Sequence, residues 1–313
     1  MAYNNLIDRT GAQSLIPEEV TREIIQAVPQ ASAVMRRARR LPNMSRKQLR
    51  MPVLSGLITA SFVNGDTGLK QTSEVSWEDV FVTAEELAVI VPIPESVLND
   101  VDYDIWGEVQ PRIIEAFGVA FDQAVIYDTN APSSWPDGIV AAATAASQAI
   151  TLGTGTDLYD DLLGEGGVVA KVEEDGFMVN GHIAALSMRA KLRGLRDAEG
   201  NPIFNRVMQA ATMYELDGAP IDFPLNGSMI PATALQVAGD WSQLVYSIRQ
   251  DITYKLLTEA VIQDGSGNIV HNLAQQDMVA LRAVMRLGWA LPNPINQVNT
   301  NDSTRYPFAV LLP

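Results

Sequence analysis

The sequence predicts an α+β protein with one long helix and two groups of strands. The helix is indicated over residues 104–128, where apolar side chains recur at helical spacing and form a broad stripe. The strands are indicated over residues 50–93 and 244–291, because apolar and polar residues alternate there. Of the 313 residues, 47% are hydrophobic, so the chain can bury a core and is globular rather than disordered.

The N-terminal region is predicted to begin as an arm and to continue as a helix. Residues 1–17 offer no core of their own. Pro17, followed by Glu18 and Glu19, is typical of a first helical turn, and apolar residues recur at helical spacing up to Val28. Pro29 interrupts this helix, and residues 31–40 are predicted to form a second, short one.

Residues 50–93 are predicted to form a long two-stranded excursion. The outgoing strand covers residues 50–63, a polar, Gly-rich tip covers 64–73, and the returning strand covers 74–93. A hairpin by itself is only marginally stable in water. We therefore expect a neighbouring protein chain to stabilise it.

The middle of the chain mixes helices with short strands. One helical turn is predicted over residues 94–99, and Pro111 either kinks the long helix or marks its first turn. The later elements are a helix over 157–173 capped by Asp157, a buried strand over 177–186, a basic surface helix over 187–197 and short strands over 213–239.

The closing strands show the clearest periodicity. Every second residue from 279 to 289 is apolar, whereas Arg282 and Arg286 fall on the opposite face, as in a strand with one buried side. The apolar face comprises Val279, Leu281, Ala283, Met285, Leu287 and Trp289. Strands are also predicted over 244–257 and 259–263, and the Pro/Asn-rich residues 291–313 are predicted to be extended.

Charge is unevenly distributed along the chain. The formal net charge is −15, with 37 acidic and 22 basic residues. Seven of the basic residues form a basic band that no acid interrupts: Arg36, Arg37, Arg39, Arg40, Arg46, Lys47 and Arg50. The band is either a contact with an acidic patch of another copy of this chain, a solvated helix face followed by a basic loop, or a nucleic-acid contact. Because the rest of the chain is acidic, contact between copies is favoured.

Residues able to support catalysis are scarce. Cysteine is absent, which excludes disulfides, thiolate metal sites and a cysteine nucleophile, and only His182 and His271 could act as imidazole bases. Three spaced acids, Asp100, Asp102 and Asp104, match the start of a calcium loop, but Ile105 and Pro111 occupy the positions that require Gly and Glu. We therefore predict no catalytic residue, cofactor or metal site. An acidic hydrolase using His182 and Ser187 is the enzymatic alternative.

The order of segments resembles a known family. LIPEEVTREIIQAV, the basic band, RMPVLSG with the excursion, the helix ending FDQAVIYD, the PDGIV loop and GDWSQLVYSIRQDITYKLL follow one another. In this order they resemble the major capsid protein of tailed bacteriophages, which has the Hong Kong 97-type fold. The resemblance covers residues 15–292.

The resemblance implies an architecture of an N-terminal arm, an extended two-stranded loop, a peripheral domain with a long spine helix and an axial domain. The tip of the extended loop would include Asn64, Gly65, Asp66, Gly68 and Lys70. The implied boundaries are the N-terminal arm at 1–34, the extended loop at 46–90, the peripheral domain at 35–45, 91–137 and 251–290, the axial domain at 138–250 and a C-terminal extended segment at 291–313.

The resemblance also implies a function and partners. Copies would form hexamers and pentamers of an icosahedral shell that encloses double-stranded DNA without sequence-specific binding, in a virion assembled in the host bacterial cytoplasm. Scaffold and portal proteins would be partners, with a decoration protein as a further candidate, whereas no membrane is implied. In some relatives a loop lysine is crosslinked to a neighbour's asparagine; here these would be Lys70 and either Asn272 or Asn293. The alternative is an encapsulin-type shell that encloses a cargo enzyme.

Overall fold

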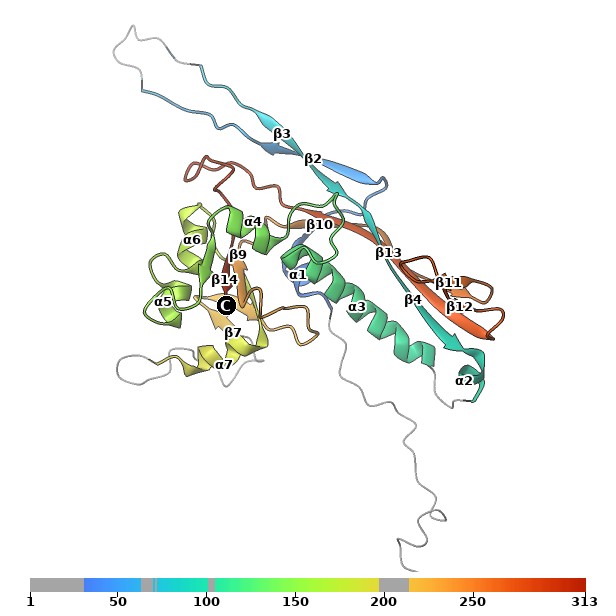
Figure 1. Cartoon of the computed structure of the whole chain (residues 1–313). Helices are drawn as coiled ribbons and strands as arrows, with labels where there is room; N and C mark the ends of the chain where they lie inside the picture. The colour runs from blue at the N-terminus through green and yellow to red at the C-terminus, as the bar shows by residue number, and fades with distance from the viewer. Residues whose placement is uncertain (1–30, 63–69, 71, 101–104, 197–213) are drawn as a thin grey trace, which may run out of the picture.

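The computed structural model describes residues 31–62, 70, 72–100, 105–196 and 214–313. Two sheet-centred bodies lie side by side, and a two-stranded arm projects from the body that contains the long helix (Figure 1). Among the described residues, no helix is both long and apolar enough to cross a membrane.

The first body is a four-stranded sheet packed against the long helix. The strand order is β1 (Arg39–Arg40), β10 (Val245–Leu257), β13 (Met278–Ala290) and β4 (Glu85–Pro94). The helix α3 (Ile105–Tyr127) runs along one face of the sheet (Figure 1). The predicted apolar face of β13 is confirmed, because its residues from Leu281 to Trp289 join Phe117 and Phe121 of α3 in one core. Pro111 lies inside the helix rather than in its first turn.

The second body is a six-stranded sheet that brings distant parts of the chain together. Its order is β5 (Ala149–Thr151), β14 (Phe308–Leu312), β9 (Gln236–Gly239), β6 (Gly181–Ala184), β8 (Ala219–Asp222) and β7 (Tyr214–Leu216). Helices α5 (Leu158–Leu163), α6 (Val168–Glu174) and α7 (Leu186–Gly194) bury apolar residues against one face. Helix α4 (Ile139–Ala145) contributes to the core on the other face, which is continuous with the core under α3.

Several predicted elements differ in extent. The predicted helix over 157–173 is two helices, because Gly164 ends α5; Asp157 does cap it, accepting hydrogen bonds from the amides of Tyr159 and Asp160. The predicted outgoing strand ends early, since β2 is Gln48–Leu54. The returning strand divides into β3 (Trp77–Thr83), which pairs with β2, and β4, which pairs with β13.

Three of the predicted domain boundaries can be compared with the strand pairing. The boundary at residue 90 falls inside β4 and the one at residue 250 inside β10, so both strands belong wholly to the four-stranded sheet. The segment predicted to be extended ends in β14, which pairs with both β5 and β9. The apolar residues of β14 pair with strands that are far away in the sequence, so no local pattern identified them as a strand.

The linker to β14 is held by two buried charged residues. The Asp175 carboxylate accepts hydrogen bonds from Gln148 Nε2 at 2.6 Å, Asn299 Nδ2 at 2.7 Å and the Tyr306 amide at 2.8 Å. The Arg305 guanidinium donates to the carbonyl oxygen of Asn293 at 3.1 Å. These contacts fix the path by which the chain enters the six-stranded sheet.

Three small elements complete the fold. Helix α1 (Ala33–Arg37) packs against α3 and is shorter than the helix predicted over residues 31–40, because Arg39 and Arg40 pair with β10 as strand β1. Helix α2 (Glu95–Asp100) is the predicted turn after β4. Strands β11 (Val261–Gln263) and β12 (Ile269–Asn272) form a hairpin beside the far end of the four-stranded sheet (Figure 1).

Candidate self-association surfaces

The arm exposes apolar side chains that find no cover in their own chain. Beyond β2, Ile58 is exposed by 65% and Phe62 by 104%. Lys70, on the returning side, is exposed as well. The other predicted tip residues lie outside the described residues: Asn64, Gly65, Asp66 and Gly68. Large apolar side chains left in water on a projecting element indicate a contact with another molecule.

The base of the arm is fixed rigidly to the body. Thr83, the last residue of β3, passes so close to β13 that a Cβ added to Gly288 would lie 2.2 Å from its carbonyl oxygen. The same oxygen accepts a hydrogen bond from Trp135 Nε1 at 2.9 Å. Val82 is fully buried next to Ala290 in a small core under the arm. The direction of the arm is therefore set by the fold of the subunit.

Four residues of the basic band pair with carboxylates of their own chain. Asp222 of β8 accepts Arg37 Nε at 2.6 Å and Arg36 Nη1 at 3.2 Å, which ties α1 to the six-stranded sheet. Along the arm, Lys47 lies 3.4 Å from Glu85 and Arg50 lies 3.3 Å from Asp79. Part of the band therefore stabilises the subunit itself.

The other three residues of the band are exposed. Arg40 donates a hydrogen bond to Asn43 at 3.1 Å, and among the described residues neither it nor Arg39 nor Arg46 makes an ion pair. Arg46 also lines an open groove of about 600 Å³ with Lys47 and Arg50, and Phe81 is a further lining residue. This cationic groove is available to a negatively charged partner.

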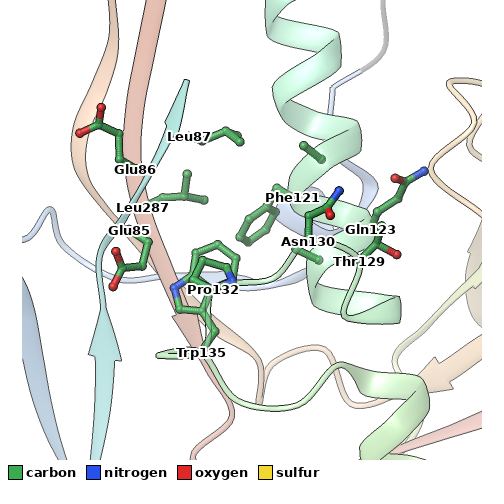
Figure 2. A pocket seen from close by; sticks show the side chains of 12 residues that line it. Glu85, Glu86, Leu87, Phe121, Gln123, Thr129, Asn130, Pro132, Trp135 and Leu287 are labelled. Atoms are coloured by element: carbon green, nitrogen blue, oxygen red, sulfur yellow. The ribbon is translucent and has the colours of Figure 1, made fainter. Parts of the chain in front are cut away.

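A second concavity lies beside the cationic groove, between α3, β4 and the loop that follows α3. It has a volume of about 240 Å³. Figure 2 shows Phe121, Leu287, Pro132 and Trp135 around it, with Gln123 and Asn130 at the helix side. The rings of Phe121 and Trp135 meet edge to face, with centroids 6.1 Å apart, so they support each other in the wall. We call this concavity the spine pocket.

A buried carboxylate joins α1 to the middle of α3. Asp122 is fully buried and accepts hydrogen bonds from the amide of Ala33 at 2.8 Å, the amide of Val34 at 3.2 Å and the hydroxyl of Ser32. Burial raises the pKa of Asp122 to about 6, against the lowering effect of these hydrogen bonds. One turn earlier, Gly118 leaves room for the chain, because a Cβ there would lie 2.9 Å from the Ser32 amide.

This junction was missed in the sequence. The available signal was a glycine and an acid four residues apart within the apolar stripe of α3, which places both on one helix face. An acid within a buried stripe needs hydrogen-bond donors, but the sequence does not say which segment supplies them.

The residues that the sequence offered as a catalytic base or as metal ligands do not come together in the described structure. His182 lies fully buried in β6, its Nδ1 is 3.0 Å from Gln236 Nε2, and burial lowers its pKa to about 4. Asp100 ends α2, whereas Asp102 and Asp104 lie outside the described residues. Within the part of the chain that the structure describes, no cluster of three or more His, Asp or Glu residues could hold a metal ion.

The two asparagines considered for a crosslink differ in their availability. Asn293 donates through Nδ2 to the Arg305 carbonyl oxygen at 2.8 Å and accepts from Arg305 Nε at 3.3 Å, so it is engaged in the linker to β14. The side-chain amide of Asn272, at the end of β12, donates to the Gln275 side chain at 2.8 Å, and its backbone amide donates to Gln276 Oε1 at 3.2 Å; both contacts lie at the surface.

The chain matches the model of the phage capsid family over residues 12–296. It is 28% identical over 289 residues to the major capsid protein of Staphylococcus phage 80alpha, covering 91% of this chain and 84% of that protein. It is 27% identical over 247 residues to the major capsid protein of Klebsiella oxytoca phage phiKO2, covering 76% of this chain and 54% of that protein.

Solved structures are similar over nearly the whole chain. A structure from Microbacterium phage Oxtober96 superposes with a TM-score of 0.84 at 37% identity, covering 99% of this chain and 100% of that one. One from Mycobacterium phage Cain gives 0.82 at 33% identity, covering 99% of both chains. The capsid of a native GTA particle, at 15% identity, shares the fold with a TM-score of 0.67 and covers 98% of both chains.

Proposed function

Because the chain belongs to the phage capsid family and has the Hong Kong 97-type fold, we propose that it works by self-association, as the subunit of hexamers and pentamers in an icosahedral shell. It is a major capsid protein of a tailed phage, and its place is the virion. The observation that carries the proposal is the rigidly based arm, whose exposed apolar residues need a second molecule. A contact between two different surfaces repeats from copy to copy and closes into rings.

The two sheet-centred bodies correspond to the domains of such a subunit. The four-stranded sheet with α3 is the peripheral domain, and the six-stranded sheet, including β14, is the axial domain that lies around the fivefold and sixfold axes. The arm of β2 and β3 is the base of the extended loop, and residues 1–34 are the N-terminal arm. This assignment moves β4 and β10 wholly into the peripheral domain and β14 into the axial domain.

The shell encloses double-stranded DNA without sequence-specific binding. The subunit carries a net charge of −15, so a wall of such subunits repels phosphates and keeps packaged DNA from adhering to it. Assembly takes place in the host bacterial cytoplasm with a scaffold and a portal protein, and a decoration protein is a further partner. An encapsulin-type shell is not favoured by the family match.

The test is to purify the protein, alone and coexpressed with the scaffold gene of its phage, and to examine both samples by negative-stain electron microscopy. Closed isometric shells or capsomer rings are expected, and the ratio of absorbance at 260 and 280 nm reports any nucleic acid inside. A monodisperse monomer in both samples, over a wide range of protein and salt concentrations, would contradict the proposal.

A further inference from the structure

The spine pocket has the properties of a receptor for one apolar side chain. Apolar side chains make up most of its lining, and two of them, Phe121 and Trp135, pack against each other. Glu85 and Glu86 line it on the β4 side. The polar side chains of Gln123, Thr129 and Asn130 lie at its helix and loop side (Figure 2). A preformed apolar pocket with a few polar groups at its edge is the usual form of a specific binding site.

The arm supplies a side chain of matching character. Phe62 is fully exposed, on a segment that leads away from the body. Thr59 lies opposite Ser73 on the other side of the arm, and the backbone amide of Thr59 donates a hydrogen bond to Ser73 Oγ at 2.9 Å. Phe62 is three residues beyond Thr59 and Lys70 is three residues before Ser73, so we expect Phe62 and Lys70 to lie opposite each other. Glu74 is four residues closer to the base of the arm than Lys70, which is about 13 Å in an extended chain.

A subunit cannot fill its own pocket with this side chain. The spine pocket lies at the base of the arm, because Glu85, one of its lining residues, follows β3 by only two residues. The arm runs away from that base (Figure 1), and its first pairs are fixed by β2 and β3. If Phe62 of an arm fills a spine pocket, the arm and the pocket must therefore belong to two different copies of the chain.

Charge around the pocket supports the same occupant. Glu85 lies at the boundary between the spine pocket and the cationic groove, since its carboxylate accepts a hydrogen bond from Ser134 at 2.8 Å and lies 3.4 Å from Lys47, both of which line the groove. The arm carries exposed acids on its returning side, and Glu74 and Glu78 make no ion pair among the described residues. An arm that crosses the base of the next arm can thus bring a carboxylate to the groove.

We infer that the spine pocket of one subunit receives Phe62 from the arm of a second copy, while Glu74 of that arm faces the cationic groove. The inference rests on the proposed self-assembly and specifies its contact. Since tip and base are different surfaces of one chain, each subunit gives one such contact and receives one, which is the heterologous arrangement from which closed rings are built.

The experiment replaces Phe62 with p-benzoylphenylalanine, which keeps an aromatic ring and reacts with nearby C–H bonds on illumination. Assembled particles are irradiated, and crosslinked peptides are identified by mass spectrometry. We expect intermolecular crosslinks to residues 85–87, 120–124 or 129–135. The same probe at Ser61, the neighbouring position, should give a lower yield at these residues.

Two variants test the contact from both sides. Phe62→Ala removes the apolar side chain, and Ala120→Phe fills the pocket from α3; each should raise the protein concentration needed for assembly about tenfold, from the loss of one buried aromatic side chain. Ser61→Ala and Ile114→Phe are the matched controls on the arm and on the helix, and unchanged circular dichroism checks the fold.

The outcomes separate this inference from the proposed function. Normal shells whose Phe62 probe reacts with other surfaces would overturn the pocket as the receptor and leave the shell function intact. Absence of any assembly in the unmodified protein would overturn both. Crosslinks to the pocket between copies, together with impaired assembly of Phe62→Ala, would support the contact.

Discussion

Asp122 holds the start of α1 against the middle of α3 through one buried carboxylate. Its raised pKa of about 6, against 3.8 for an unburied aspartate, means that ionisation is opposed by burial in the folded subunit. The stabilisation from the protonated form is therefore fully present below pH 3.8 and is lost as the pH rises through 6. The difference between these two pKa values corresponds to about 3 kcal/mol of stability.

We predict that Asp122→Asn removes this part of the pH dependence. The free energy of unfolding, measured by urea denaturation between pH 4 and 7.5, should fall more steeply on acidification than in the unmodified subunit, because a stabilising protonation has been lost. Asp128→Asn, at an exposed position, is the control and should leave the curve unchanged. Identical curves for Asp122→Asn and the unmodified subunit would contradict the assigned shift.

His182 acts in the opposite direction. Burial lowers its pKa from 6.5 to about 4, so the neutral imidazole is favoured in the fold, and its contribution to stability, present above pH 6.5, is lost as the pH falls through 4. We predict that His182→Gln loses less stability on acidification than the unmodified subunit, by about 3 kcal/mol over this range. His271→Gln is the matched control in the same urea titrations, and an equal effect of both substitutions would count against the assignment.

At the scale of the elements, Gly288 allows the arm to cross β13. We predict that Gly288→Ala lowers the free energy of unfolding by about 1–3 kcal/mol, because a Cβ cannot fit against the Thr83 carbonyl oxygen without moving the end of β3. Differential scanning calorimetry measures the effect. Gly194→Ala, at the end of α7 where an added Cβ has no neighbour within 4 Å, should be close to neutral. Equal melting temperatures for the two variants would refute the crossing argument.

The outer part of the arm is expected to serve assembly and not folding. Ser55 and Ser76 face each other, with the Ser55 amide donating to the Ser76 carbonyl oxygen at 2.9 Å. Replacing residues 56–75 by Asn-Gly should therefore leave a closed short hairpin and a folded subunit. Circular dichroism should be unchanged while electron microscopy shows no shells. Normal shells from this variant would contradict an intersubunit role for the loop.

The sequence predicted the elements that have a clear apolar periodicity of their own. It did not predict elements that form only by pairing with strands far away in the chain. The alternation along β13 identified its buried face, and the stripe of α3 identified the long helix. By contrast, β14 follows a Pro/Asn-rich linker and gains its structure from β5 and β9, more than 60 residues away in each case. The basic band was found as a charge pattern, but its division into paired and free residues depends on where Asp222, Glu85 and Asp79 come to lie.

At the scale of the whole molecule, assembly brings together subunits that each carry a charge of −15. The exposed arginines Arg39 and Arg40 offset some of this repulsion if they face acids of a neighbour. We predict that the double variant Arg39→Glu, Arg40→Glu requires a higher protein concentration to assemble, with the difference largest at low salt because ions screen such contacts. Light scattering at several salt concentrations measures it.

The control for this prediction is a charge reversal of equal size elsewhere. Arg193→Glu with Lys191→Glu changes two exposed cations of α7 and alters the net charge by the same amount. If both double variants shift assembly equally at every salt concentration, net charge alone explains the effect and the position of the band has no special role.

The position of β14 also sets the time at which a subunit becomes competent. Residues 308–312 form the strand that lies between β5 and β9 and so complete the six-stranded sheet. A nascent chain cannot place this strand between β5 and β9 until residues 308–312 have left the ribosome, so its six-stranded sheet remains unfinished until then. Neighbouring chains on one messenger RNA therefore cannot present a completed six-stranded sheet to each other before this strand is in place, and products truncated before residue 308 lack the strand altogether.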